Sequence, residues 1–419
     1  MVSSEPLHIA FFNRSYYPDF GATGQLLTEL AEDLAARHGH RVTVVAGVPI
    51  TNDVPLASAP RWYRPVCREE HNGVRILRAF GTTFRPRRFA GRFSNYISYF
   101  LSAAVASARL GRADVVVALT DPPIIGLVAG LAARVSGARM VFLCEDVFPE
   151  VARLLEDFQS RRVEAMLDRV SRHIVRRADR VVALGDTMKR RLVETKGADA
   201  AKISVIHNWA DAEAIVPVAK DNPFARANGL ADRFVLMHSG NVGLSQNVDV
   251  LLDVADRLRD IGDLVVAIVG DGARKPVLVA EAERRGLDNV RFFPYQPKER
   301  LSELFSSADA FLVSLKHGLA GFIVPSKVYG ILAAGRPFVV SADEDCEAAR
   351  IARERGCGLV VPPGDAAAIS AAVRQLHADP ERRRAMGARA RAAGETYDRR
   401  RAVAAYEQVF RELSNGHAR

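Results

Sequence analysis

Two glycine-rich segments carry the residue types that bind phosphates and sugars. Gly21-Ala22-Thr23-Gly24 follows an apolar run over Leu7–Phe12, and His238-Ser239-Gly240-Asn241-Val242-Gly243 follows another over Phe234–His238. Glycines after a strand let backbone N–H groups approach an anion at the start of a helix. The first segment lacks the full G-x-G-x-x-G spacing, which disfavours a NAD site. A turn that merely needs glycine is the alternative for each segment taken alone.

Two further motifs suggest anion chemistry. Gly270-Asp271-Gly272 closes an apolar run, although such a triplet is most often only a turn. Pro325-Ser326-Lys327 precedes a predicted helix that ends before Gly335-Arg336-Pro337. A lysine in the first turn of a helix lies beside the positive end of the helix dipole, which is unfavourable unless an anion binds there. The alternative is a solvated lysine that points away.

A basic segment with aromatic residues follows the first strands. The chain carries a net charge of +9. The segment from Arg61 to Phe100 contains nine arginines, and its only acidic residues are Glu69 and Glu70. After Pro86, the residues Phe89, Phe93, Tyr96, Ile97 and Phe100 recur at helical spacing. A stripe of this kind is usually core. The flanking arginines favour contact with anionic lipid instead, with the later residues turning inward. The predicted contact residues are Arg85, Arg87, Arg88, Phe89, Arg92 and Phe93.

Apolar runs and helical patterns alternate along the chain, which is the rhythm of a parallel doubly wound sheet. A segment rich in proline, asparagine and glycine over 208–232 separates two such halves. We therefore predict an α/β fold with two Rossmann-like domains, whose ligands bind outside the carboxyl ends of the strands. The predicted strands are Leu7–Phe12, Arg41–Ala46, Asp114–Leu119, Met140–Leu143, Arg180–Leu184, Ile203–Ile206, Phe234–His238, Leu264–Val269, Val290–Phe293, Ala310–Val313, Pro337–Val340 and Gly358–Val361.

Composition excludes several classes of protein. With 48% hydrophobic and 26% charged residues, the chain is typical of a globular protein. The four cysteines are scattered and form no Cys/His cluster, which predicts neither disulfides nor a structural zinc. The N-terminus lacks the pattern of a signal peptide, and no apolar run is long enough to span a bilayer. The charge surplus comes with no nucleic-acid-binding motif, so no nucleic acid partner is expected.

Eight segments in order resemble the retaining GT-B glycosyltransferases of family 4. They are Gly21–Gly24, Ile206-His207-Asn208-Trp209-Ala210-Asp211, Ser239-Gly240-Asn241, Val269-Gly270-Asp271-Gly272, Val290-Arg291-Phe292-Phe293, Ala308-Asp309-Ala310, Ala333-Ala334-Gly335-Arg336-Pro337 and Gly358-Leu359-Val360-Val361-Pro362-Pro363-Gly364-Asp365. The segment Cys144–Glu150 and Pro325-Ser326-Lys327 are most similar to the branch that makes bacterial exopolysaccharide, capsule and O-antigen.

This resemblance implies a GT-B architecture, with two facing domains and the active site in the cleft between them. The N-terminal, acceptor-side domain is expected over residues 1–207, followed by a linker over 208–232. The C-terminal domain over 233–397 is expected to bind a nucleotide-sugar. A final helix over 398–419 is expected to return to the N-terminal domain.

The resemblance also implies which residues meet the donor. Gly270, Asp271, Gly272, Tyr295 and Gln296 would border the base. Gly240, Asn241, Ser326 and Lys327 would lie near the diphosphate, and Phe322 and Ile323 would line the sugar. Gly21, Thr23, Gly24 and Gln25 would form an acceptor-side loop.

Three departures from the family pattern stand out. The paired glutamates that many members carry are absent here, since the counted positions are Phe322 and Gly330. The arginine and lysine that often grip the diphosphate fall at about Asn241 and Gln246. The catalytic-loop histidine corresponds to Glu145, which Asp146 follows.

The chemistry implied is cleavage of an anomeric bond, which leaves negative charge on the diphosphate. Lys327 and backbone N–H groups near Gly240 would stabilise that charge. Glu145 or Asp146 could accept the proton of the acceptor hydroxyl, although Asp146 could instead cap the next helix. No Asp-x-Asp pair lies beside the nucleotide motifs, so no obligatory metal is expected.

The resemblance thus implies a retaining hexosyl- or N-acetylhexosaminyl-type transferase. Its donor would be a nucleotide-sugar, with a UDP-sugar favoured, and its acceptor a glycan or a lipid-linked glycan in cell-surface polysaccharide assembly. Together with the basic segment, it predicts a cytoplasmic protein, peripheral on the inner face of the plasma membrane. A GT-B nucleotide-sugar 2-epimerase and a catalytically silent sugar-nucleotide-binding subunit are the alternatives.

Overall fold

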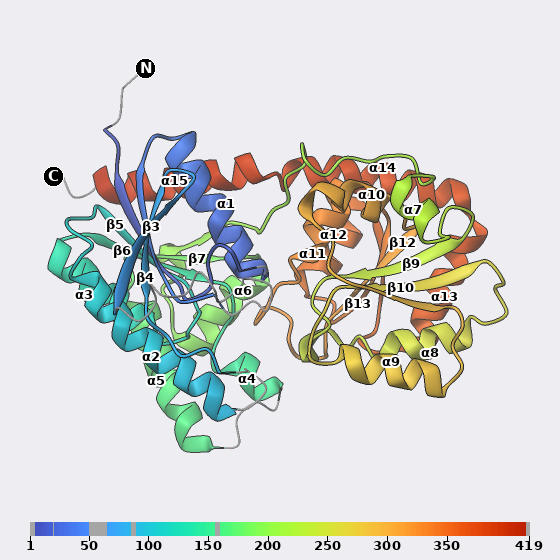
Figure 1. The fold of residues 1–419 in the computed structure, drawn as a ribbon, viewed down its shortest axis with the longest axis horizontal. Helices are drawn as coiled ribbons and strands as arrows, with labels where there is room; N and C mark the ends of the chain where they lie inside the picture. Colours follow the sequence, from blue (N-terminus) through green and yellow to red (C-terminus); the bar gives the residue numbers. More distant parts are fainter. Residues whose placement is uncertain (1–4, 20, 50–64, 85–88, 156–159, 416–419) are drawn as a thin grey trace. The chain divides into compact units, whose positions relative to one another are not determined.

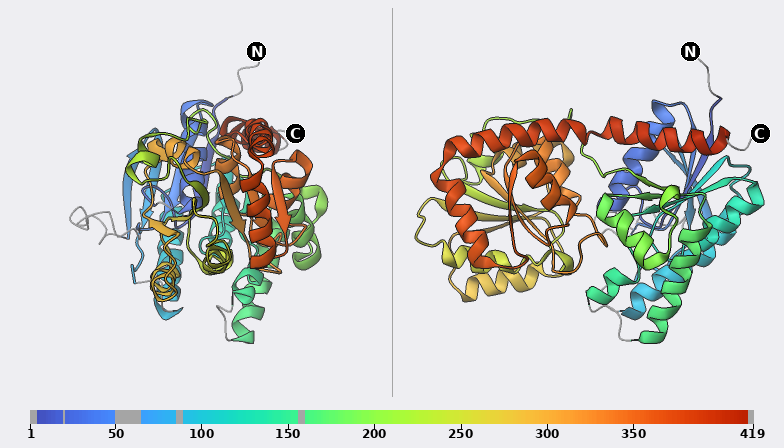
Figure 2. Two further views of the ribbon diagram at one scale, coloured as in Figure 1. Left: turned by 90° about the vertical axis from the view of Figure 1, so that its right-hand side faces the viewer. Right: turned by 180° about the vertical axis from the view of Figure 1, so that it is seen from behind.

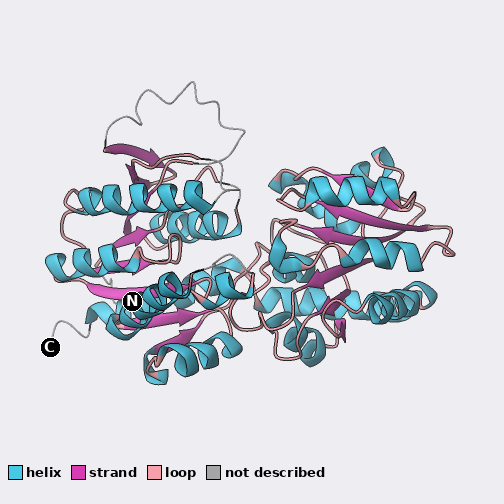
Figure 3. Ribbon diagram, turned by 90° about the horizontal axis from the view of Figure 1, so that it is seen from below, coloured by secondary structure: helices cyan, strands magenta, loops and turns pink. Residues whose placement is uncertain are grey.

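The structure, a computed structural model, describes residues 5–19, 21–49, 65–84, 89–155 and 160–415. The chain divides into two compact units. Unit 1 comprises Met1–His207 with Ala402–Arg419, and unit 2 comprises Asn208–Arg401. In each unit, helices cover the faces of one sheet (Figure 1, Figure 3).

The sheet of unit 1 has the strand order β3-β4-β2-β1-β5-β6-β7-β8. All neighbouring strands are parallel except β3 and β4, which form an antiparallel hairpin at the edge. The chain proceeds toward one edge from β1 and toward the other from β5, so β1 and β5 flank a switch point. The strands are β1 (His8–Phe12), β2 (Arg41–Ala46), β3 (Val66–His71), β4 (Val74–Ala79), β5 (Val115–Ala118), β6 (Arg139–Cys144), β7 (Arg180–Ala183) and β8 (Ile203–Val205).

Helices pack on both faces of this sheet (Figure 1). One face carries α1 and the end of α15, where Phe11 of β1 meets the ring of Phe410 edge to face. The other face carries α2, α3 and α5, and α3 packs against both of its neighbours. The helices are α1 (Ala22–Ala36), α2 (Phe89–Ser107), α3 (Gly126–Ser136), α4 (Glu150–Leu154), α5 (Arg161–Arg177), α6 (Asp186–Arg191), a π-helical turn (Leu192–Lys196), a 3-10 turn (Ala200–Lys202) and α15 (Arg399–Asn415).

The sheet of unit 2 is fully parallel, with the strand order β11-β10-β9-β12-β13-β14. Here β9 and β12 flank the switch point. The strands are β9 (Phe234–Ser239), β10 (Leu264–Val269), β11 (Val290–Phe293), β12 (Ala310–Ser314), β13 (Phe338–Ser341) and β14 (Gly358–Val361).

Unit 2 is also layered, with its sheet between helices in the view from below (Figure 3). The α-helices are α7 (Pro223–Ala227), α8 (Val250–Arg257), α9 (Lys275–Arg284), α10 (Leu301–Ser306), α11 (Lys327–Ala333), α12 (Glu347–Arg355), α13 (Ala366–Ala378) and α14 (Pro380–Thr396). Two 3-10 turns span Leu244–Gln246 and Lys298–Arg300. The segment predicted as a linker packs within this unit: the Arg391 guanidinium donates to the carbonyl oxygens of Ala212, Ile215 and Ala333.

Sequence pattern accounts for these elements directly. β10 is a continuous run of Leu, Val, Ala and Ile and is buried along its whole length, as a central parallel strand must be. α13 starts where the Asp365 carboxylate accepts from the N–H of Ala368, at 2.9 Å. α3 ends at Gly137, which adopts φ +68°.

The predicted fold class is confirmed, and each predicted strand is present within two residues at either end. The β3–β4 hairpin was not predicted. Its residues belong to the basic segment, and Asn72-Gly73 occupies the turn with positive φ at both residues. Such a dipeptide between alternating residues is a strong hairpin signal.

Close packing of α11 on α14 depends on small residues. A Cβ at Gly394 would lie 2.8 Å from both the N atom of Ala333 and the carbonyl carbon of Leu332. These atoms are backbone and cannot rotate away. A Cβ at Gly130 in α3 would instead meet only the flexible side chain of Met140, whose Sδ lies at 3.3 Å.

These two helical glycines should therefore respond oppositely to alanine. We expect Gly394→Ala to lower the melting temperature, because overpacking costs about 1–3 kcal/mol and exceeds the gain of roughly 1 kcal/mol in helix propensity. Gly130→Ala should be neutral or stabilising. Calorimetry of the full chain tests this, and equal shifts in both variants would contradict the packing argument.

Candidate active site

The glycine turns of unit 2 meet at the carboxyl ends of β9 and β10. Gly240 follows β9, Gly270 follows β10, and a Cβ at Gly270 would overlap the carbonyl oxygen of Gly240. Both glycines have positive φ, at 123° and 129°. The N–H of Val242 donates to the carbonyl of Asp271, at 2.9 Å, and so joins the two turns. Only glycine allows this approach of two backbones.

A lysine reaches these turns from α11. The Nζ atom of Lys327 lies 3.2 Å from Nε2 of His238, at the end of β9, and also contacts Oε1 of Gln246. An added Cβ at Gly240 would lie 3.7 Å from Nζ. The ammonium group therefore lies beside the first glycine turn.

Burial governs the protonation of this pair. It lowers the pKa of Lys327 to about 7. Burial and the neighbouring Lys327 lower the pKa of His238 well below its usual value. A neutral imidazole can accept a hydrogen bond from the ammonium group. Lys327 therefore gains or loses its charge near neutral pH, and a bound anion would favour the charged form.

Other residues predicted to contact the nucleotide-sugar lie in the segments that follow β11 and β12. Tyr295 is half-exposed, and burial together with the Asp271 carboxylate raises its pKa. Gln296 donates to the carbonyl of Pro294, at 3.1 Å. In the turn after β12, Phe322 and Ile323 both donate their N–H groups to the carbonyl of Leu319.

The turn after β12 is tied to the same region. The N–H of Lys316 donates to the carbonyl of Ser245, at 2.9 Å, one residue before Gln246. Ser326 immediately precedes α11. Asn241 lies beside Gly272, where an added Cβ would come within 2.7 Å of its Oδ1. The structure therefore brings Gly240, Asn241, Gly270, Asp271, Gly272 and Lys327 together.

Unit 1 has an ionic cluster at its own switch point. The carboxylate of Asp121, which follows β5, forms an ion pair with Nη2 of Arg14 at 2.9 Å. It also accepts a hydrogen bond from the hydroxyl group of Ser15, at 2.6 Å. Both partners follow β1. The backbone N–H of Asp121 also donates to Oδ1 of Asn13, at 3.2 Å. These contacts join the segments that follow β1 and β5.

Asp146 and Glu145 follow the neighbouring strand, β6. Burial, and then the carboxylate of Asp121, raise the pKa of Asp146 to about 6. Asp146 remains partly exposed, whereas Glu145 is 9% exposed. The N-cap of α4 is Pro149 rather than Asp146, so helix capping does not explain the aspartate. A carboxyl group whose pKa is raised toward neutral is a candidate for acid–base chemistry.

A buried ion cluster supports the end of this loop. Nζ of Lys196, in the π-helical turn, lies 2.7 Å from a carboxylate oxygen of Glu150 and 2.8 Å from one of Asp168 in α5. Lys196 is fully buried. A buried charge of this kind is tolerated only because it is paired and hydrogen-bonded. The cluster joins the segment after Asp146 to α5.

The predicted acceptor-side loop needs correction. α1 begins at Ala22, so Thr23, Gly24 and Gln25 lie in its first turn, and only Gly21 remains outside the helix. The N–H of Gln25 donates to the carbonyl of Gly21, at 3.0 Å. Gly24 was assigned to a turn because of its residue type. The space around it does not require glycine, since an added Cβ would lie at an ordinary contact distance of 3.4 Å from the Cβ of Asp19.

The predicted lipid-contact residues are described only in part. Arg85, Arg87 and Arg88 lie outside the described residues, while Phe89 and Arg92 belong to α2. Phe93 is 53% exposed.

Part of the basic segment has a structural role instead. Arg78 in β4 is buried, pairs with Glu69 at 2.8 Å and donates to the carbonyls of Gly47 and Tyr17. The arginine count therefore overstates the charge available at the surface.

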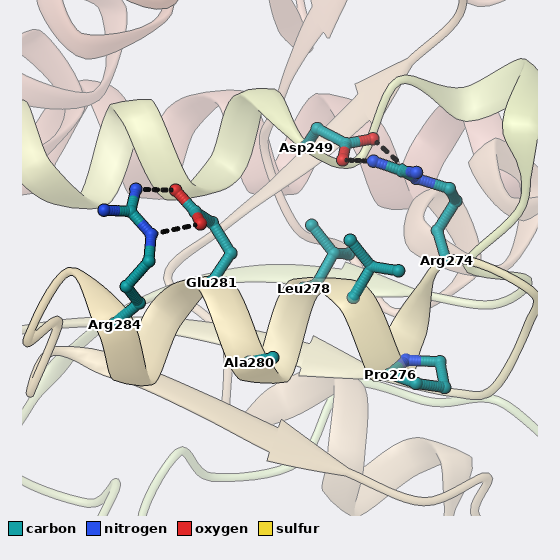
Figure 4. Close-up of a pocket in the computed structure, with 8 residues that line it drawn as sticks. Asp249, Arg274, Pro276, Leu278, Ala280, Glu281 and Arg284 are labelled. Carbon is teal, nitrogen blue, oxygen red and sulfur yellow. Dashed lines mark hydrogen bonds and ion pairs between the residues drawn. The ribbon is translucent and has the colours of Figure 1, made fainter.

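Three further observations concern the described residues. A hollow along α9 has paired charges on its walls, Asp249 with Arg274 and Glu281 with Arg284, and contains none of the predicted site residues (Figure 4). Across the ranges that the structure describes, no group of three or more His, Cys, Asp or Glu residues is placed to hold a metal ion. No helix in those ranges is long and apolar enough to cross a membrane.

Comparison with known proteins agrees with this arrangement. Residues 21–209 match the family described as "Glycosyl transferase 4-like domain", and residues 221–393 match "Glycosyl transferases group 1". Together with the fold, these matches define a GT-B glycosyltransferase. The chain, which joins the two domain types in that order, belongs with the glycosyltransferases of family 4.

Curated relatives and solved structures support this assignment. The chain is 28% identical to the putative colanic acid biosynthesis glycosyl transferase WcaI of Escherichia coli K12, over 88% of this chain and 92% of that protein. It is 29% identical to the probable glycosyltransferase WbjE of Pseudomonas aeruginosa, over 66% and 69%. The fold is similar to that of Anabaena HepE, solved with UDP and glucose, with a TM-score of 0.72, 16% identity and coverage of 97% and 99%.

Sequence reasoning missed several residues of these clusters. It identified His238 and Gln246 only as part of a turn and as a departure from the family pattern, and it did not consider Arg14 or Asp121. A signal existed: each of the last two follows an apolar strand, at the edge of the sheet where ligands bind. No spacing rule pairs residues that are 107 positions apart, as Arg14 and Asp121 are.

The raised pKa of Asp146 gives a prediction about stability. Its ordinary value is 3.8, so the folded state binds this proton more tightly than the unfolded state. The stabilisation it provides is complete below about pH 4 and is lost as the pH rises through about 6. We expect Asp146→Asn to melt a few degrees (~2–4 °C) above the unmodified protein near pH 8 and at the same temperature near pH 4. A difference that does not depend on pH would contradict the assignment.

Proposed function

We propose that the protein transfers a sugar, with retention, from a UDP-sugar to a glycan or lipid-linked acceptor in cell-surface polysaccharide assembly. The observation that carries the proposal is Lys327, placed beside the joined glycine turns at the switch point of unit 2. The name of WcaI, a putative colanic acid biosynthesis enzyme, supports the acceptor class. The UDP and glucose in the HepE structure support the donor.

The proposed chemistry assigns a role to each cluster. A diphosphate beside Gly240 accepts a charge-assisted hydrogen bond from Nζ of Lys327, which takes up a proton and turns from His238 and Gln246. The cation then stabilises the negative charge that develops as the anomeric bond breaks. Because Lys327 and the open glycine turns supply this stabilisation, the transfer is proposed to need no metal.

Unit 1 is proposed to supply the group that accepts the proton of the acceptor hydroxyl. Asp146, with its pKa of about 6, is mostly ionised at neutral pH and can accept a proton from a hydroxyl group. The more buried Glu145 is the other candidate. The proposed setting is cytoplasmic, peripheral on the inner face of the plasma membrane, where anionic lipid is present and a lipid-linked acceptor is accessible.

Thermal shift with UDP, GDP, ADP and their sugar conjugates tests the donor, with magnesium and with EDTA in parallel. Stabilisation by a ligand requires preferential binding to the folded state. We expect a response to UDP and to one UDP-sugar that EDTA does not change. No response to any nucleotide would overturn the enzyme proposal, whereas a response without any transfer of sugar would favour the catalytically silent subunit.

The product distinguishes the reaction class. Transfer should yield a glycoside whose anomeric configuration, read by NMR, equals that of the donor sugar. Conversion of the donor without an acceptor would instead indicate the epimerase.

Lys327→Met tests the diphosphate contact. Loss of a charge-assisted hydrogen bond costs about 1.5–3 kcal/mol, so we expect the affinity for UDP to fall by about 10- to 100-fold. The exposed Lys202 in unit 1 provides the control, since Lys202→Met removes the same charge and should leave the affinity unchanged. Equal loss in both variants would indicate a non-specific effect of charge.

The pH dependence of UDP binding is a second test of Lys327. Above its pKa of about 7 the free protein must take up a proton to bind the anion. Between about pH 7.5 and about 9, where UDP is fully ionised, the affinity should fall by up to tenfold per pH unit. Calorimetry should show this slope in the unmodified protein and a flat profile in Lys327→Met. An equal slope in both would assign the proton to another group.

A further inference from the structure

Three neighbouring helices of unit 1 present apolar side chains to solvent. In α2, Leu101 is 60% exposed, and Val105 lies one turn further on. In α3, Leu127, Leu131 and Val135 recur every fourth residue, and Val135 is 80% exposed. This spacing places one row on one side of a helix.

These rows point away from the sheet. Ala129 and Ala133 alternate with the exposed residues of α3 and are buried, so the two sets lie on opposite sides of the helix. In the same way, Tyr99 and Ala103 of α2 are buried. The helices lie side by side on one face of the unit in the views from the front and from behind (Figure 1, Figure 2).

The third helix of this layer supplies charge. α5 has exposed Met166 among exposed cations. Its two acids are engaged: Glu164 pairs with Arg153 at 3.4 Å, and Asp168 pairs with both Arg172 and Lys196. Neither α2 nor α3 contains an acidic residue. The exposed cations of α5 are Arg161, Arg162, Arg169, Arg176 and Arg177.

We propose that the outer face of α2, α3 and α5 docks unit 1 onto an anionic lipid bilayer. We call it the three-helix face, formed by Leu101, Val105, Leu127, Leu131 and Val135 with the exposed side of α5. The inference deepens the proposed function, because the choice of a bilayer as partner rests on a lipid-linked acceptor. It moves the main contact from the predicted residues Arg85–Phe93 to the outer side of the helix layer.

Charge complementarity favours a bilayer over other occupants. Apolar side chains can insert at the level of the acyl boundary while neighbouring arginines meet phosphate headgroups. A second copy of the chain would bring a second row of arginines to the same contact, and like charges would oppose it. A bilayer rich in anionic lipid satisfies both parts of the face at once.

Vesicle flotation of the full chain tests the proposal. One preparation contains phosphatidylcholine alone, and the other includes phosphatidylglycerol at about a third of the lipid. We expect binding only to the anionic vesicles, weakening as salt is raised because the charges are screened. Absence of binding to both preparations would overturn the proposal.

Two double variants separate the two parts of the face. Arg162→Gln with Arg169→Gln should lower the partition coefficient roughly tenfold or more, because each surface cation contributes to attraction by anionic lipid. Leu131→Gln with Val135→Gln leaves the charge unchanged and should also lower binding by roughly tenfold. These side chains are exposed, so the fold is expected to persist.

Matched controls lie in unit 2. Arg382→Gln with Arg384→Gln removes the same charge from α14, and Val216→Gln with Val277→Gln removes exposed apolar groups; both should bind vesicles normally. Normal vesicle binding by the face variants would overturn the proposal. A dimer in light scattering that the face variants dissociate would do the same, since it would show that a second copy covers the face.

The UDP-induced thermal shift keeps the two proposals distinguishable. The face variants should retain that shift while losing vesicle binding. Vesicle binding without any response to UDP would support the docking face and contradict the proposed donor. Loss of both readouts in a face variant would show misfolding, in which case single Leu131→Gln and Arg169→Gln variants decide the outcome by flotation.

Discussion

The close approach of two backbone turns is the constraint on which the donor side of unit 2 depends. Gly240 and Gly270 adopt positive φ and leave no room for a side chain between them. The turns are further held by hydrogen bonds from the Lys275 ammonium group to the carbonyls of Gly270 and Phe293, at 2.6 and 3.0 Å. Because the backbone is held in this way, Lys327 meets a surface with a defined shape rather than a mobile loop.

The two units place different chemical groups at equivalent positions of their sheets. Each places its polar groups at a switch point, where the connections on either side of two neighbouring strands diverge and leave a crevice. Unit 2 lines that crevice with glycine backbone and one lysine. Unit 1 places the ion pair of Arg14 and Asp121 there. Burial, and then the carboxylate of Asp121, raise the pKa of the nearby Asp146 to about 6.

How much the sequence predicts depends on whether the determining interactions are local. Apolar runs and glycine turns report local requirements, and they yield the strands and the Gly240–Gly270 region. The switch points depend on the strand order, which the sequence does not predict. The contact of Lys327 with His238 joins residues 89 positions apart, and nothing in either segment indicates it. α1 begins at Ala22 without a capping side chain at Gly21, so no capping residue marks this boundary in the sequence, and Gly24 is predicted in a loop. The exposure of side chains in α3 cannot be predicted from the sequence either, because the composition of this helix is that of a buried helix.

The buried cluster around Lys196 restricts how this region can change in evolution. Its ammonium group lies between Glu150 and Asp168, so replacing either acid leaves a buried charge short of a partner, and replacing the lysine leaves two acids facing each other. Each single step is therefore unfavourable, while a concerted exchange of all three for apolar residues can be tolerated. The three positions should be inherited as one unit, although 46 residues separate Glu150 from Lys196.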